Sequence, residues 1–167
     1  GQQGCSWQGN PPTCHSGGGG GGRIAVWCTS TTYTGSIQAK GGAGGASYTG
    51  SPGTIYEQCG SSIVDRLTIN NFDRGAPQLV TPICDSGITN FSVTNLYVLN
   101  QARVSFEPAD VAELQHAFAE IGVLHGDASG TLDVIGQSTV ILSNNGLKHS
   151  PVTYELSAER VGPHENV

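Results

Sequence analysis

Residues 96–106 read LYVLNQARVSF, and residues 132–142 read LDVIGQSTVIL. The two stretches share the pattern Leu-x-Val-x-x-Gln-x-x-Val-x-Phe/Leu at an offset of 36 positions. In each stretch two apolar-polar alternations, typical of half-buried strands, flank a short polar corner. A repeat of about 20–50 residues indicates a stacked architecture, in which each unit buries its apolar face against its neighbours. A chance match between hydrophobic positions is the alternative.

The same period-two alternation occurs in much of the remaining chain. It places apolar side chains on one face in residues 36–40, 66–70, 102–106 and 152–156. The run at 24–28, like that at 96–99, is apolar at successive positions, which predicts strands covered on both faces. The sequence therefore predicts an all-β chain.

Residues 109–119 depart from this pattern. Apolar residues follow helical spacing from Val111 to Ile121, and Pro108 is suited to the first turn of a helix. We therefore expect one short helix near 109–119. The alternative is a strand in which Ala117, Ala119 and Ile121 point inward.

Composition limits the function classes. The chain has 167 residues, a length that fits one domain. Its net charge is −6 and only 12% of its residues are charged, so we expect little affinity for nucleic acid or an anionic membrane. No run approaches the roughly 18 apolar residues of a membrane span. The chain starts at Gly1 without methionine, so we expect a processed product or a piece of a longer protein.

The cysteines lie at positions 5, 14, 28, 59 and 84 (Cys5, Cys14, Cys28, Cys59 and Cys84). Their spacing does not match the short C-x2-4-C pairs of metal sites. We expect four of the five to be paired as disulfides in an oxidising compartment, with the connectivity open and the odd cysteine free to pair between chains. Buried inert thiols are the alternative. The sequon Asn90-Phe91-Ser92 predicts N-glycosylation at Asn90, which also fits a secreted protein.

Two Asp-Arg pairs are the best enzymatic candidates. Asp65-Arg66 and Asp73-Arg74 flank an expected strand, and clustered acids with a basic group perform acid/base cleavage of polysaccharides. Surface ion pairs at the ends of a strand are the simpler interpretation. We therefore expect no enzymatic activity and no cofactor.

Weaker signals surround residues 125–133. Asp127 and Asp133 are candidate calcium ligands, and Ser129 within His125–Gly130 (HGDASG) is a weak candidate nucleophile. A polar turn explains this segment better. The five histidines, at 15, 116, 125, 149 and 164, are scattered and are expected at the surface, so the sequence predicts no metal site.

Aromatic side chains offer a third class of function, glycan binding. An exposed aromatic ring near Asn or Asp can stack on a sugar. Packing against disulfides and glycine corners is the simpler alternative. The candidates are Trp7, Trp27, Tyr33, Tyr48, Tyr56, Tyr97 and Tyr154.

The first half of the chain resembles a known repeat. The matching segments are 17–27 (GGGGGGRIAVW), 33–42 (YTGSIQAKGG), 51–56 (SPGTIY) and 66–71 (RLTINN). They are similar to the glycine-rich repeat of large secreted, right-handed parallel β-helix proteins. The resemblance implies an extracellular structural or adhesive role, and it brings no catalytic motif.

Together these observations predict a right-handed parallel β-helix, or β-solenoid, stapled by disulfides in its glycine-rich part. We expect a Cys/Gly-rich N-terminal segment (1–22) and one β-solenoid domain (23–167), although the glycine content also changes near residue 60. Glycine corners and rows of asparagine would support the stack, and the run 17–22 is expected to be an ordered corner rather than a flexible linker. The expected asparagine corners are Asn70, Asn71, Asn95, Asn100, Asn144 and Asn145.

The expected function is an extracellular structural module. It would build or decorate a surface fibre, filament or adhesive layer by stacking with itself or with neighbouring modules of a larger chain. Open strand edges, low charge and an odd cysteine favour such self-association. A glycan-binding module and a polysaccharide lyase or hydrolase are the alternatives.

Overall fold

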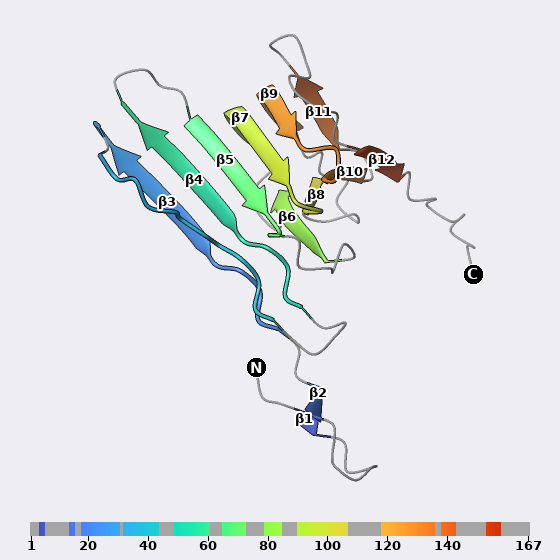
Figure 1. The fold of residues 1–167 in the computed structure, drawn as a ribbon. Helices are drawn as coiled ribbons and strands as arrows, with labels where there is room; N and C mark the ends of the chain where they lie inside the picture. The colour runs from blue at the N-terminus through green and yellow to red at the C-terminus, as the bar shows by residue number, and fades with distance from the viewer. Residues whose placement is uncertain are drawn as a thin grey trace, which may run out of the picture.

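The computed structural model describes residues 4–5, 14–15, 18–30, 32–43, 49–60, 65–72, 79–84, 90–106, 118–135, 138–142 and 153–157 (Figure 1). These residues form twelve strands and no helix. The strands are β1 (Gly4–Cys5), β2 (Cys14–His15), β3 (Arg23–Cys28), β4 (Thr54–Cys59), β5 (Asp65–Asn70), β6 (Val80–Cys84), β7 (Asn90–Leu99), β8 (Arg103–Phe106), β9 (Phe118–Gly126), β10 (Thr131–Ile135), β11 (Thr139–Leu142) and β12 (Thr153–Ser157). The described part of the chain is thus strand-rich, as the alternation predicts.

The strands form two larger sheets and one small pair. The six-stranded sheet has the order β11-β9-β7-β5-β4-β3, and the four-stranded sheet has the order β12-β10-β8-β6. From β5 onward, consecutive strands alternate between these two sheets, and all pairs formed among β5 to β12 are parallel. The pairs β1–β2 and β4–β5 are antiparallel. The core lies between the two larger sheets.

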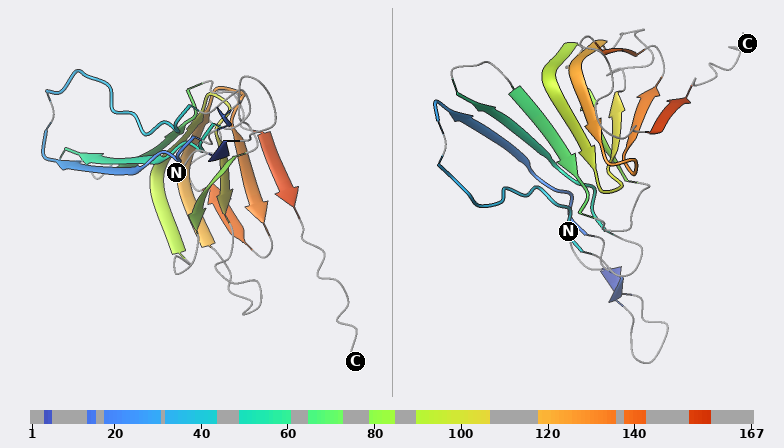
Figure 2. Two further views of the ribbon diagram at one scale, coloured as in Figure 1. Left: turned by 90° about the horizontal axis from the view of Figure 1, so that it is seen from below. Right: turned by 45° about the horizontal axis from the view of Figure 1, so that its top comes forward.

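The predicted right-handed parallel β-helix is wrong. Such a fold repeats one coil with every neighbouring strand parallel, whereas the six-stranded sheet is mixed, because β4 and β5 are antiparallel. Only residues 60–64 join these two strands, and a parallel pair needs a crossover of about a dozen residues. In addition, β3 and β4 have no counterpart in the described part of the smaller sheet, so they extend the larger sheet to one side (Figure 2).

The repeat at 36 positions does not describe the stacking either. Leu96 of β7 pairs with Leu124 of β9, and Val104 of β8 pairs with Leu132 of β10, an offset of 28 in both cases. Leu96 and Leu132 therefore lie in different sheets. Matching apolar letters mark inward positions on any strand, so they do not fix which strands are neighbours.

The last two residues of the expected helix at 109–119 belong to a strand instead. Phe118 and Ala119 belong to β9, while residues 107–117 lie outside the described residues. Both Ala119 and Ile121 are fully buried. The strand alternative is thus correct where the structure describes the chain.

The core confirms the inward positions of two predicted strands. Leu67 and Ile69 from β5 pack in one cluster with Val104 and Phe106 from β8. Fully burying side chains of this size contributes about 1.5–3 kcal/mol each. The expected strand at 36–40 is not formed, although Ala39 is buried. The expected strand at 152–156 corresponds to β12, whose side chains the structure does not describe.

The prediction that strand 24–28 is covered on both faces is also wrong. Residues 23–28 do form β3, but Ala25 is exposed and Trp27 has 68% of its surface accessible. In contrast, Leu96 and Val98 of β7 are fully buried and Leu99 is half-buried. The difference arises because β3 lies beyond the smaller sheet, which covers β7 but does not reach β3.

The described residues 18–22 of the glycine run before β3 are joined by backbone hydrogen bonds to two other segments, which fits the expected ordered corner. Three segments, 18–22, 39–42 and 50–53, meet in what we call the glycine junction. Backbone hydrogen bonds join them: Gly42 N to Gly19 O at 2.7 Å, Gly53 N to Ala39 O at 2.6 Å and Gly21 N to Ser51 O at 2.8 Å. A side chain at Gly21 or Gly53 would overlap backbone atoms of the facing segment. The junction therefore depends on glycine, and it aligns the starts of β3 and β4.

Candidate functional site

Strand β3 forms one edge of the six-stranded sheet. Its only strand neighbour among the described residues is β4. The carbonyl oxygens of Gly22 and Cys28 accept hydrogen bonds from Thr54 and Gly60, at the two ends of β4, at 3.2 and 2.9 Å. Because backbone groups of successive residues in a strand point to opposite sides, those of Ala25 point away from β4. The sheet thus ends in a six-residue strand with outward-facing amides.

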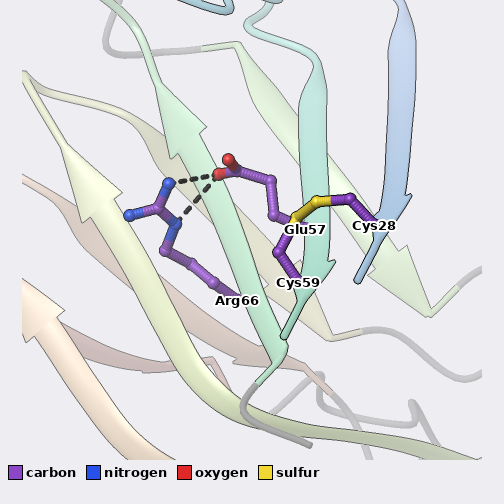
Figure 3. The surroundings of a disulfide bond; sticks show 4 residues. All are labelled: Cys28, Glu57, Cys59 and Arg66. Atoms are coloured by element: carbon purple, nitrogen blue, oxygen red, sulfur yellow. Dashed lines mark hydrogen bonds and ion pairs between the residues drawn. A yellow bond between two sulfur atoms is a disulfide. The ribbon is translucent and has the colours of Figure 1, made fainter. Parts of the chain in front are cut away.

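A disulfide fixes this edge strand. Cys28 and Cys59 are direct partners across β3 and β4, and their Cα atoms lie 4.5 Å apart (Figure 3). This confirms two of the predicted disulfide cysteines. In the chain-entropy account, closing a loop with a sequence separation of 31 stabilises a protein by about 3–4 kcal/mol.

For the other three predicted disulfide cysteines, the structure describes only the backbone position. Cys5 and Cys14 are partners in the antiparallel pair β1–β2, and Cys84 is the last residue of β6. Asn90, the predicted glycosylation site, is the exposed first residue of β7. The pairing of these cysteines and the modification of Asn90 stay predictions.

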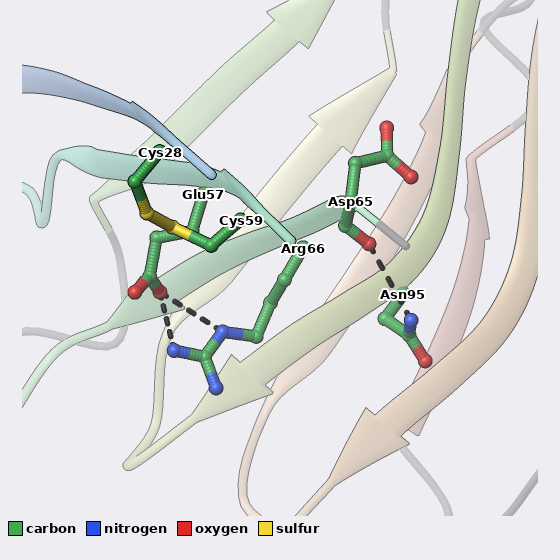
Figure 4. Close-up of polar contacts among 6 residues, drawn as sticks. All are labelled: Cys28, Glu57, Cys59, Asp65, Arg66 and Asn95. Atoms are coloured by element: carbon green, nitrogen blue, oxygen red, sulfur yellow. Dashed lines mark hydrogen bonds and ion pairs between the residues drawn. A yellow bond between two sulfur atoms is a disulfide. The ribbon is translucent and has the colours of Figure 1, made fainter. Parts of the chain in front are cut away.

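A groove of about 690 Å³ lies on the face of the larger sheet that points away from the core. One wall is the segment 32–38, which contributes Tyr33 and Ile37, and the floor is formed by β3, β4, β5 and β7. Glu57 and Arg66 meet in this groove, with Arg66 Nε donating to Glu57 Oε2 at 2.9 Å (Figure 4). Sheet pairing explains the contact, because Glu57 and Arg66 are direct partners across β4 and β5.

Beside the ion pair, two rings are stacked. Tyr97 of β7 and His125 of β9 are register partners, and their ring centroids are 4.1 Å apart with an interplanar angle of 4°. The Arg66 guanidinium lies 5.7 Å from the Tyr97 centroid, a cation–π distance. His125 Nε2 also lies 3.0 Å from Asn95 Oδ1. This polar and aromatic row continues the groove floor.

The Asp-Arg pairs do not form an acid cluster. Asp65 and Arg66 are successive residues of β5 and point to opposite faces, as Figure 4 shows. Asp65 Oδ1 accepts a hydrogen bond from Thr94 N–H at 2.7 Å, and Oδ2 accepts one from the Tyr56 hydroxyl at 3.4 Å. Burial raises the pKa of Tyr56, and the charge of Asp65 and this hydrogen bond raise that pKa further. Asp73 and Arg74 lie outside the described residues.

The two calcium candidates are in different environments. Asp133 is 1% exposed and pairs with Arg103, whose Nε lies 2.5 Å from Asp133 Oδ2. Asp127 is exposed at a corner and accepts hydrogen bonds from Ser129 and Asn100. Among the described residues, no three His, Cys, Asp or Glu side chains are grouped to hold a metal ion.

The Asp127 corner explains the HGDASG segment as a turn. Partial burial acts to raise the pKa of Asp127, but hydrogen bonds from Ser129 and Asn100 outweigh it and lower that pKa. The Ser129 hydroxyl donates to Asp127 Oδ1 at 2.6 Å and accepts from Gln101 N–H at 2.8 Å. Ser129 is therefore a link between stacked corners.

Asparagine side chains also link two stacked corners, at Asn70 and Asn100, which are two of the six predicted corner asparagines. Asn70 Oδ1 accepts from Asn100 Nδ2 at 2.9 Å and from Phe72 N–H at 2.8 Å. Asn100 has φ 55°, in the left-handed region that asparagine tolerates. In contrast, Asn95 lies inside β7, and residues 144–145 lie outside the described part.

The candidate aromatics fall into three environments. Trp27 is exposed on the other face of β3, 6.0 Å from the Tyr56 ring, while Tyr33 in the groove wall is 62% exposed. Tyr97 lies in the groove floor. Trp7 and Tyr48, together with the Tyr154 side chain, lie outside the description. Sequence reasoning missed Glu57 as a groove residue, although the short connection 60–64 could have predicted its pairing with Arg66.

Comparison of the chain with protein families, with curated proteins and with solved structures finds no match. The resemblance of residues 17–71 to the glycine-rich repeat therefore stays an expectation. In the described part of the chain, no helix has the length and apolar character needed to cross a bilayer.

Proposed function

We propose that this chain is an extracellular structural module that associates with further copies of itself through the open edge of β3. The observation that carries the proposal is the position of this strand at the end of the six-stranded sheet. Exposed strand edges readily pair with another chain, and natural proteins usually shorten, charge or cover them. Here the edge strand is six residues long, and its central residues Ala25 and Val26 are apolar.

The opposite end of the same sheet is a suitable partner. That end is β11, whose outer side has no strand neighbour among the described residues. If β3 of each copy pairs with β11 of the next, both edges of an interior copy are used, and the assembly keeps one free β3 edge and one free β11 edge at its two ends. A head-to-tail contact produces an open filament when its rotation does not close a ring, and we expect the filament here.

Charge favours the same orientation. Residues 1–60, which contain β3, carry a net charge of +1, and residues 61–167 carry −7. Near β11, the exposed Glu120 of β9 is the register partner of Ile141. The opposite signs of these two parts of the chain favour a contact between the β3 part of one copy and the later part of the next over contacts between like parts.

The disulfide supports the extracellular part of the proposal. Cys28–Cys59 joins the edge strand to the sheet, and structural disulfides persist in oxidising compartments. The proposal assigns no catalytic role, since the carboxylate of Asp65 is engaged by Thr94 and Tyr56.

Matched substitutions at one edge residue test the proposal. Ala25→Pro removes the outward amide, a change that an edge strand tolerates, whereas Ala25→Val retains it. In size-exclusion chromatography with light scattering under non-reducing conditions, we expect wild type and Ala25→Val to form oligomers and Ala25→Pro to be monomeric. Ala25→Lys, with Thr94→Lys at an exposed position of the interior strand β7 as the charge control, repeats the test without proline. A monomeric wild type at high concentration, or unchanged oligomers of Ala25→Pro and Ala25→Lys, would falsify the proposal.

A further inference from the structure

We propose that the groove formed by segment 32–38 and the outer face of β3, β4, β5 and β7 binds a neutral oligosaccharide. This site is distinct from the edge of β3, because it lies on a face of the sheet. Its volume of about 690 Å³ falls within the range of about 300–1,000 Å³ that small-molecule sites occupy. The choice of ligand follows from the chemistry of the lining.

The ion pair in the groove has hydrogen-bonding capacity left. Arg66 donates through Nε and Nη2, and both bonds go to Glu57 Oε2. Glu57 Oε1 remains as an acceptor and Arg66 Nη1 as a donor beside it. A sugar hydroxyl both donates and accepts, so adjacent hydroxyls match such a pair. The Thr68 hydroxyl, also in the lining, adds a group that donates and accepts.

The remaining lining suits the C–H faces of sugar rings. Val26, Ile37 and Ile55 give the groove an apolar surface. Tyr33 adds an accessible aromatic ring in the wall, with 62% of its surface exposed. A ring face combined with a few fixed polar groups is the usual composition of a site for an amphipathic ligand.

The charge balance selects the neutral class. The charges of Glu57 and Arg66 cancel, and no other Asp, Glu, Lys or Arg is among the described residues that line the groove. An anionic sugar would have to compete with Glu57 for Arg66, and the displaced carboxylate would then repel it. Neutral hexoses require no such exchange.

The test uses the full chain under non-reducing conditions. We would titrate it, by calorimetry and by NMR of the tyrosine rings, with hexasaccharides of glucose, mannose, galactose and N-acetylglucosamine, and with hexagalacturonate as the anionic probe. We expect saturable binding of at least one neutral probe at about 1 mM or below, and weaker binding of hexagalacturonate. Absence of neutral binding, or stronger anionic binding, overturns the inference.

Variants then assign the binding to this groove. Tyr33→Ala is expected to weaken binding about three- to tenfold, and Trp27→Ala, an exposed aromatic on the opposite face, is the control that should leave it unchanged. Thr68→Val preserves shape and is expected to weaken binding about fivefold, so it tests the site even if Tyr33→Ala fails to fold. Equal effects of Trp27→Ala and Tyr33→Ala, or unchanged binding by Thr68→Val, contradict the assignment. Ala25→Lys should bind as wild type does, which separates this site from self-association.

Discussion

Gly21 and Gly22 are neighbours in one glycine run, yet the structure gives them different tolerance for a side chain. At Gly21 an added Cβ would overlap the backbone of Gly53 and Ala39, whereas at Gly22 it would meet no atom within 4 Å. The sequence predicts an ordered corner here, but the six successive glycines look alike. Which of them face the other two segments depends on contacts with residues about 20 and 30 positions away.

This difference is directly testable. We expect Gly21→Ala to lower the free energy of unfolding by about 1–3 kcal/mol, because the backbones at the glycine junction must separate. Gly22→Ala, the matched control, is expected to change it by less than about 0.5 kcal/mol. Thermal and urea unfolding of both variants measure the two values. Equal destabilisation by the two substitutions would contradict the close approach at Gly21.

Asp127 gives a prediction about pH. Its carboxylate holds two stacked corners through Ser129 and Asn100, and these hydrogen bonds lower the pKa of Asp127 in the folded chain. A lowered folded-state pKa gives stability that is present above the unfolded pKa of about 4 and is lost as the pH falls through the folded-state value. We therefore expect Asp127→Ala to be less stable than wild type at pH 7, by about 1 kcal/mol.

The difference between Asp127→Ala and wild type should shrink as the pH is lowered below about 4. Urea unfolding of both proteins between neutral and acid pH measures it. Asp133→Ala is not a substitute, because Asp133 is buried and its loss leaves Arg103 without this partner. A difference that is constant or grows on acidification would show that the Asp127 carboxylate does not act through these hydrogen bonds.

At the scale of elements, alternation predicts which residues point inward but not which strands pair. Leu67, Ile69, Val104 and Phe106 are buried as predicted. Pairing depends on connection length: residues 60–64 are too few for a crossover, so β4 and β5 are antiparallel. The same short connection brings Glu57 onto Arg66 and creates the groove, which composition and spacing of charged residues alone do not indicate.

The disulfide acts on one element, the edge strand. We expect the double variant Cys28→Ala/Cys59→Ala to lose about 3–4 kcal/mol of stability, because the unfolded chain gains freedom. Hydrogen exchange should increase at the amides of β3 more than at those of β7, which lies inside the sheet. Peptide-resolved exchange measured by mass spectrometry tests this. Unchanged protection of β3 would mean that its backbone bonds to β4 suffice.

At the scale of the whole molecule, residues 1–60, which contain β3, carry a net charge of +1 and residues 61–167 carry −7. Association between these oppositely charged parts of two copies should weaken with salt, since the screening length falls from about 10 Å at 0.1 M to about 3 Å at 1 M. We therefore expect the oligomers of the native chain to dissociate progressively across this range. Sedimentation velocity at several salt concentrations measures this shift. Stronger association at high salt would instead indicate a hydrophobic contact, as through the exposed Trp27.

Electron microscopy of the non-reduced chain at high concentration is the most direct test of assembly through the edge of β3. We expect filaments in which copies follow one another head to tail, and we expect them to disappear in Ala25→Pro but not in Ala25→Val. Discrete monomers of the wild-type chain, or filaments that persist in Ala25→Pro, would contradict assembly through the edge of β3.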